Sequence, residues 1–212
     1  MMRSILTLIL IVIRLVGSSQ NDSLLYGENT KLTEGIYMNY EQFRNNNPIT
    51  RTDIQTTIGK DQLDFFGKLV DQPTVTFQKD GVTNTAETKN AWGFYQNNIL
   101  HVNYKETFYK VPVFGAICYL VALVEVPVTY PGYYYPGYGM GATSRTREVR
   151  EFIINFYDGK MEELNLEKVE QLLSRDETLY KEFKSLKRRK QKEQISRFIK
   201  KYNEAHPVYF LK

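Results

Sequence analysis

The chain has 212 residues, of which 42% are hydrophobic and 14% aromatic, and its formal net charge at pH 7 is +4. This composition argues against an intrinsically disordered chain, because enough apolar surface is present to build a core. The single cysteine, Cys118, excludes an intrachain disulfide. With only two histidines, His101 and His206, a catalytic cysteine and a zinc site are both poorly supported.

Residues 1–19 have the layout of a secretory signal peptide. Arg3 gives a positive start, residues 4–13 are almost entirely apolar, and small residues precede Gln20. A membrane anchor is the main alternative, but Arg14 interrupts an apolar run that is already shorter than the about 20 residues of a span. A lipoprotein signal would need a cysteine directly after the small residues. We therefore expect cleavage, no stable membrane span afterwards, and a released periplasmic or extracellular product.

Residues 20–158 are predicted to form a β-rich domain after a flexible lead-in at 20–33. Asn39, followed three residues later by Gln42, predicts the start of a short helix. The continuous apolar character of 117–125 predicts a central strand, or one that is buried on both faces. Strands are expected at 34–38, 63–66, 74–78, 92–95, 99–102, 108–112, 117–125 and 148–154, with a hairpin joining 92–95 to 99–102.

A loop rich in tyrosine, glycine and proline is expected at 129–146, between two strands. Two Tyr-Pro-Gly units keep it out of regular structure. Tyrosine offers a large contact area and a hydroxyl group at little entropic cost, so such loops suit protein or glycan surfaces. The possible partner-contact residues are Tyr130, Tyr133, Tyr134, Tyr135 and Tyr138. The alternative is a long connection without a binding role.

Residues 159–212 are predicted to form a helical segment that packs on the β-rich domain or projects from it. Ser174 and Glu177 have the spacing of a capping box. At the basic run 184–192, either one long helix leaves the body of the protein or two helices meet at a break. Nucleic acid is not expected as a partner, because the run is interleaved with core-type residues and the predicted location is outside the cytoplasm.

No sequence motif points to a catalytic site, a cofactor or a metal. The chain has no His-Glu-x-x-His, Gly-x-Ser-x-Gly or phosphate-binding glycine motif. Carboxylates such as Asp61, Asp64 and Asp71 are scattered, so a hydrolytic pair would have to be assembled by the fold.

Three passages resemble secreted or envelope proteins of Bacteroidota-type bacteria that have no assigned activity. They are Leu32-Thr33-Glu34-Gly35-Ile36-Tyr37 with Tyr40 to Pro48, then Ala91-Trp92-Gly93-Phe94 to Val102, and Lys201-Tyr202-Asn203-Glu204-Ala205-His206-Pro207. The resemblance implies export and brings no catalytic residues. The tyrosine-rich loop is an insertion relative to that pattern.

These observations together predict an α+β fold, with a mainly antiparallel β-sheet followed by C-terminal α-helices. The function expected from them is a non-enzymatic, exported binding or interaction protein that contacts its partner through 130–141. The alternative is an envelope hydrolase with a site built from residues distant in sequence.

Overall fold

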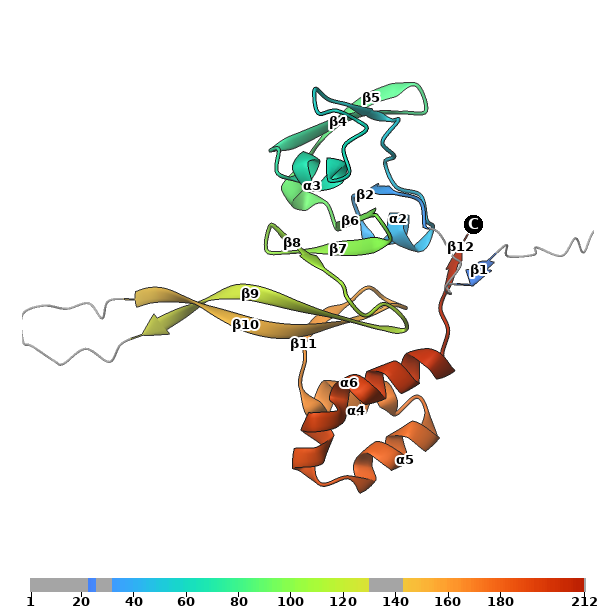
Figure 1. Ribbon diagram of the computed structural model, residues 1–212, viewed down its shortest axis with the longest axis vertical. Helices are drawn as coiled ribbons and strands as arrows, with labels where there is room; N and C mark the ends of the chain where they lie inside the picture. The colour runs from blue at the N-terminus through green and yellow to red at the C-terminus, as the bar shows by residue number, and fades with distance from the viewer. Residues whose placement is uncertain (1–22, 26–31, 130–142, 212) are drawn as a thin grey trace, which may run out of the picture.

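The computed structural model describes residues 23–25, 32–129 and 143–211. It confirms the α+β fold, with antiparallel sheets that precede the C-terminal helices (Figure 1). The predicted signal peptide at 1–19 and the five tyrosines of the predicted contact loop lie outside the described residues.

A four-stranded antiparallel sheet lies in the middle of the molecule, with the order β2-β6-β7-β8. Its strands are Gly35–Tyr37, Gly93–Gln96, Ile99–Tyr104 and Thr107–Lys110, in chain order. The predicted hairpin is confirmed as β6–β7, and Asn97 and Asn98 turn it with φ of 52° and 61°. Positive φ at both turn residues matches the right-handed twist of the strands.

Both faces of this sheet are buried, because separate cores lie above and below it. Ile36 and Phe94 belong to the upper core, whereas their neighbours Tyr37 and Tyr95 belong to the larger lower core. Side chains alternate between the faces of a strand, so neither face of these strands reads as polar in the sequence.

The upper core is closed by a small sheet with the order β3-β4-β5 and by helix α3. These elements are Ile54–Gln55, Thr74–Lys79, Val82–Glu87 and, for α3, Phe65–Val70. The predicted strand at 63–66 is therefore wrong. The Gln96 side chain accepts from the Phe66 N–H at 2.9 Å and ties the first turn of α3 to β6. A short apolar run fits either element, and this tertiary contact decides between them.

Below the middle sheet, a long hairpin is formed by β9, Ile117–Thr129, and β10, Thr143–Asn155, with β11, Met161–Glu163, on its far side. The sheet order is β11-β10-β9, so β9 is an edge strand. The prediction of a central strand at 117–125 is wrong. At the base of the hairpin Ile117 and Cys118 are both buried, so both faces are covered there, whereas Val121 and Leu123 further along are exposed.

Three helices close the lower core: α4, Leu166–Leu173, α5, Glu177–Ser185, and α6, Arg188–Ala205. The basic run thus contains a break between two helices. Asp176, not Ser174, caps α5, and its carboxylate accepts from the Leu179 N–H at 2.9 Å. Aspartate competes directly with serine for the N-cap position. Among the described residues, no helix is both long and apolar enough to span a membrane.

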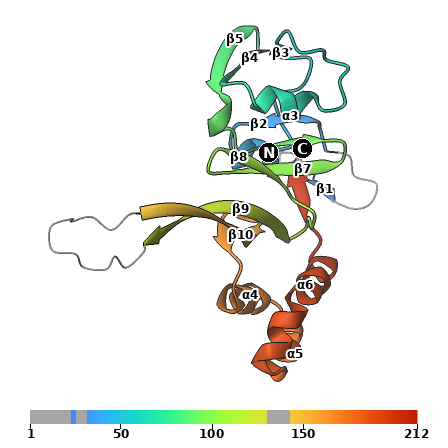
Figure 2. The ribbon, with the colours of Figure 1, turned by 60° about the vertical axis from the view of Figure 1, so that its left-hand side comes forward.

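The two ends of the described chain meet. β1, Ser23–Leu25, pairs antiparallel with β12, Tyr209–Leu211, so part of the expected lead-in is a strand (Figure 2). Beside them, Phe43 of helix α2, Tyr40–Arg44, has its ring centroid 5.2 Å from that of Phe210. Asn39 caps α2 by accepting from the Gln42 N–H, which confirms the predicted start of this helix.

Candidate functional site: the projecting arm and its groove

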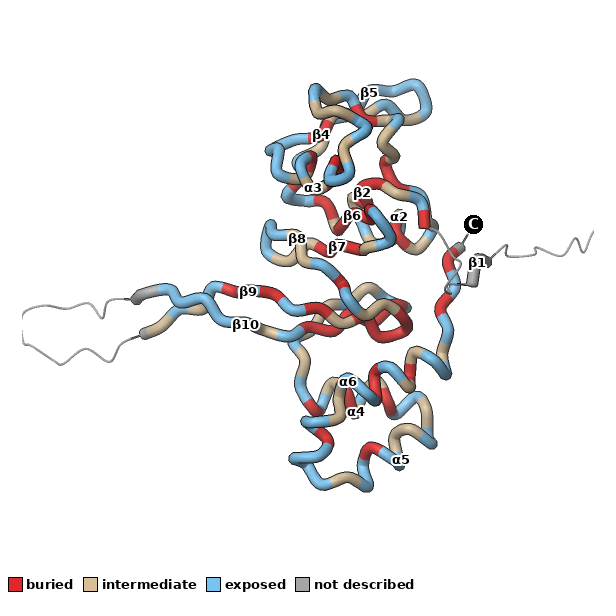
Figure 3. The backbone as a smooth tube through the Cα atoms, viewed as in Figure 1, coloured by how far each residue is buried: buried red, intermediate tan, exposed pale blue. Residues whose placement is uncertain are grey.

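The outer part of the β9–β10 hairpin, residues 121–129 with 143–151, is called the arm below. All thirteen residues of each strand are paired, from Ile117 opposite Asn155 to Thr129 opposite Thr143. At about 3.3 Å per residue, each strand is about 40 Å long. Figure 1 and Figure 3 show the arm leaving the side of the molecule, with its buried residues near the base.

One face of the arm exposes apolar side chains. Leu123 and Val149 are cross-strand neighbours and are 46% and 69% exposed, and Val121 beside them is 41% exposed. On the other face, Ala122 and Val124 are buried against the lower core. Contiguous exposed apolar residues on a projecting element are typical of interaction surfaces.

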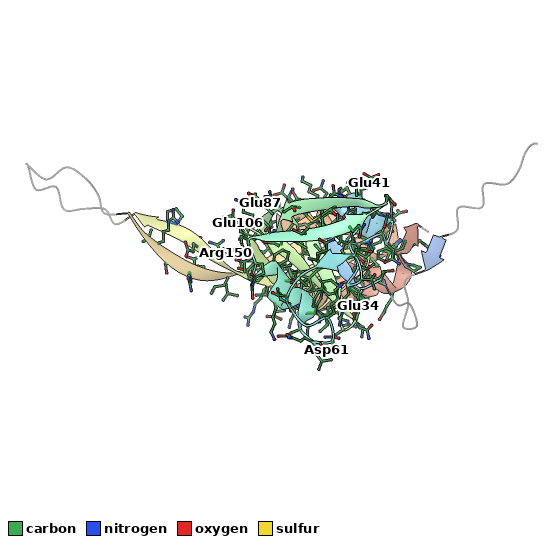
Figure 4. The ribbon with its side chains drawn as sticks, turned by 90° about the horizontal axis from the view of Figure 1, so that it is seen from above. Glu34, Glu41, Asp61, Glu87, Glu106 and Arg150 are labelled. Atoms are coloured by element: carbon green, nitrogen blue, oxygen red, sulfur yellow. The ribbon has the colours of Figure 1, made fainter. Side chains whose placement is uncertain are left out.

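Charged side chains flank this apolar stripe. Glu125 lies between two arginines, 3.4 Å from Arg145 and 3.7 Å from Arg147. Arg150 is paired more tightly, at 2.6 Å, with both Glu148 and Glu163, which raise the pKa of its guanidinium. Figure 4 shows Arg150 where the arm meets the rest of the molecule.

The five predicted contact residues lie outside the described residues, but their place in the chain is fixed. They belong to 130–142, the segment that connects the outer ends of β9 and β10. The arm therefore carries the tyrosine-rich segment at its far end.

A groove of about 720 Å³ lies where the arm diverges from the end of β7 and the start of β8. Sequence reasoning missed it, because its two walls are some 20 to 40 residues apart in the chain and no motif marks either wall. At its border, Lys105 and Glu106 form a tight turn with φ of 51° and 67°, which Lys-Glu does not predict. The lining residues are Tyr104, Lys105, Thr107, Tyr109, Leu123, Val124, Glu125, Pro127, Arg145 and Arg147.

A second hollow, of about 330 Å³, lies between β10 and α4 and includes Asp158 and Glu162. The Glu162 carboxylate is 2.8 Å from the Lys168 ammonium and 3.1 Å from that of Lys160. Both lysines lower the pKa of Glu162. The Glu162 carboxylate is therefore part of a surface ion-pair cluster with two ammonium groups.

The two histidines and the cysteine are engaged in packing or in helix capping. The His101 ring stacks on Phe94 with centroids 4.4 Å apart, and burial lowers its pKa. Its buried Nδ1 has no hydrogen-bond partner within the described part of the chain. His206 Nε2 lies 3.0 Å from the Asp176 carboxylate that caps α5. Burial raises the pKa of the Cys118 thiol to about 12.

The basic run at 184–192 lies on exposed helix surface and is partly neutralised. Lys184 is 3.0 Å from Glu170, and Glu193 is paired with both Arg189 and Lys190. These pairs are the expected pattern of a solvated helix face.

Within the described ranges, no group of three or more histidine, cysteine or acidic residues is arranged to hold a metal ion. Comparison with known proteins adds no further constraint: no protein family model, no curated protein and no solved structure matches this chain.

Proposed function

We propose that this protein is a non-enzymatic, exported interaction protein of the cell envelope or exterior, and that the β9–β10 arm is its contact element. The supporting observation is the arm itself. A hairpin paired to its outer end extends away from both cores and exposes Val121, Leu123 and Val149. An isolated two-stranded ribbon is only marginally stable in water, so the arm beyond Val126 adds little to the stability of the cores.

The tyrosines that the arm carries at its end are proposed to make the contact with a protein or glycan. The test replaces Tyr130, Tyr133, Tyr134, Tyr135 and Tyr138 by serine in the full chain. Crosslinked partners are then identified in the envelope and medium of the cells that make the protein. We expect the variant to lose at least one partner of the unmodified chain.

The matched control replaces Tyr157 and Tyr209 by serine, two tyrosines of the body that are 50% and 47% exposed. This variant should keep every partner. If the five-serine variant also kept every partner, the tyrosine segment would not be the contact surface.

Export rests on the N-terminal sequence pattern. We expect mass spectrometry of the protein outside the cytoplasm to find a chain that begins near Gln20. Recovery of only the full chain, in the cytoplasm, would contradict this part of the proposal.

A further inference from the structure

The groove between the arm and the β7–β8 turn is bordered by an edge strand whose backbone orientation is known. The Tyr119 N–H donates to the Val113 carbonyl at 2.9 Å, and the Leu123 carbonyl accepts from the Tyr109 hydroxyl at 2.8 Å. Both partners lie on the side of β9 away from β10. Because backbone groups alternate along a strand, Glu125 and Pro127 face the same side.

The edge is open over a short stretch from Leu123 to Pro127, where the arm diverges from β8 and the groove begins. Of its outward backbone groups, the Leu123 carbonyl is already occupied by the Tyr109 hydroxyl. Pro127 has no N–H to donate, so a strand added here would stop pairing at that residue. A segment of about five residues fits this edge. An extended peptide is the occupant that backbone groups of this kind recognise.

The charges of the groove select the kind of peptide. The groove is lined by three cations, Lys105, Arg145 and Arg147, and by one carboxylate, Glu125. The net charge of its lining is therefore +2. The Glu125 carboxylate is shared by both arginines, at N···O distances of 3.4 and 3.7 Å. These distances are longer than the 2.6 Å between Arg150 and Glu148. The two guanidiniums thus keep donors for further carboxylates.

We propose that this groove binds an extended acidic peptide segment of a partner protein, whose backbone pairs with the Leu123–Pro127 edge and whose carboxylates meet Arg145, Arg147 and Lys105. Successive side chains of that segment lie in turn on the face of Arg145 and Arg147 and on the opposite face beside Val124, which gives it an acidic and apolar alternation. The inference rests on the proposed role of the arm as a contact element and adds the chemistry of the partner.

The test measures fluorescence anisotropy of a labelled peptide TEVEVET added to the full chain. Two control peptides are used: TKVKVKT reverses the charge, and a TEVEVET that is N-methylated at its five internal residues keeps the charge but removes the backbone N–H donors on both edges of the peptide. We expect only unmodified TEVEVET to bind well, with an affinity that falls as NaCl is raised from about 0.05 M to about 0.5 M.

Protein variants then separate this site from general attraction. Replacing Arg145 and Arg147 together by alanine should weaken TEVEVET binding about tenfold. Glu125→Gln should strengthen it about threefold, because the competing carboxylate is removed while both arginines stay. The matched control replaces Arg188 and Arg197 of α6, two exposed arginines outside the groove, and should leave the affinity unchanged.

Equal binding of TKVKVKT or of the N-methylated peptide would overturn the proposal, as would a Glu125→Gln variant that binds TEVEVET more weakly. Absence of TEVEVET binding to every form of the protein would also overturn it. The proposed function would still stand in that case if the five-serine variant lost its partners, because that experiment changes the tyrosine segment and leaves the groove intact.

Discussion

Gly159, in the turn between β10 and β11, has a φ of 71° and lies against the ring of Tyr40. A Cβ at this position would overlap the ring carbons, and Tyr40 is held in place because its hydroxyl donates to the Phe156 carbonyl. We expect Gly159→Ala to lower the free energy of unfolding by about 2–4 kcal/mol, from left-handed strain and overpacking together. Urea denaturation measures this loss.

Gly81 provides the matched control for this prediction. Its φ is 78°, but a Cβ there would meet nothing within 4 Å. Gly81→Ala should therefore cost only the backbone term of about 1 kcal/mol. Equal losses for the two variants would show that the Tyr40 contact does not matter.

Cys118 is buried in the lower core, and its Sγ lies 3.4 Å from the Gly115 carbonyl oxygen. Burial raises the pKa of the thiol to about 12, so at pH 8 almost none of it is thiolate, the reactive form. We expect the thiol reagent DTNB to label the folded protein only at the rate of unfolding and to label the urea-unfolded chain at once. Rapid labelling of the folded protein would contradict the burial.

Several residues that the sequence singles out have roles in packing. Gly35 lies against Pro48 and the Ile49 carbonyl, and Gly93 lies against the His101 carbonyl. The passages with the bacterial resemblance therefore contain residues that hold strands in close contact. The sequence places both glycines in these passages, and only the fold shows which backbone each one approaches.

At the scale of elements, one side chain fastens α6 to β9. The Asn203 amide donates to the Ile117 carbonyl at 2.9 Å and accepts from the Ile117 N–H at 2.8 Å. Asn203→Ala leaves both backbone groups unpaired and should cost about 1–3 kcal/mol in urea denaturation. Asn84→Ala removes an exposed side-chain hydrogen bond to Val82 and should cost less than about 0.5 kcal/mol.

The start of α5 makes stability depend on pH. The Leu179 N–H first, and then His206, lower the pKa of the Asp176 carboxyl below its ordinary value of 3.8. The charged form is thus favoured by folding, and its contribution is present above 3.8 and is lost as the pH falls through the lower folded value. Asp176→Asn keeps a capping oxygen without the charge.

We therefore expect the difference in unfolding free energy between the unmodified chain and Asp176→Asn to be largest above pH 3.8 and to shrink on acidification. Urea denaturation across this range measures it. A difference that stays constant to low pH would mean that the charge of Asp176 plays no part.

The order of elements was predictable from the sequence wherever the signal was local. Asn39 and Gln42 at the start of α2, and the Asn97–Asn98 turn, depend only on neighbouring residues. The strand predicted at 63–66 failed because a contact from Gln96, thirty residues away, fixes Phe66 in a helix. The groove could not be predicted from the sequence either, because its walls are distant in the chain and meet only in the folded protein.

At the scale of the whole molecule, the two cores and the arm have separate roles. The buried residues of β9 and β10 lie mainly in the inner half, from Ile117 to Val124 and from Phe152 to Asn155. Further out, Pro127, Arg145 and Arg147 are exposed. The cores should therefore fold without the outer arm.

A shortened chain tests this separation. Val126 and Thr146 are directly opposite and their backbone groups face each other, so an Asn-Gly turn can join them in place of residues 127–145 without changing the register of the inner strands. We expect the unfolding free energy to stay within about 1 kcal/mol of that of the full chain, because the buried side chains of both cores remain. The shortened chain should also lose TEVEVET binding, since Pro127 and Arg145 are removed from the groove. A large loss of stability would instead assign the arm to folding, whereas retained stability with lost binding leaves recognition as the role of the arm.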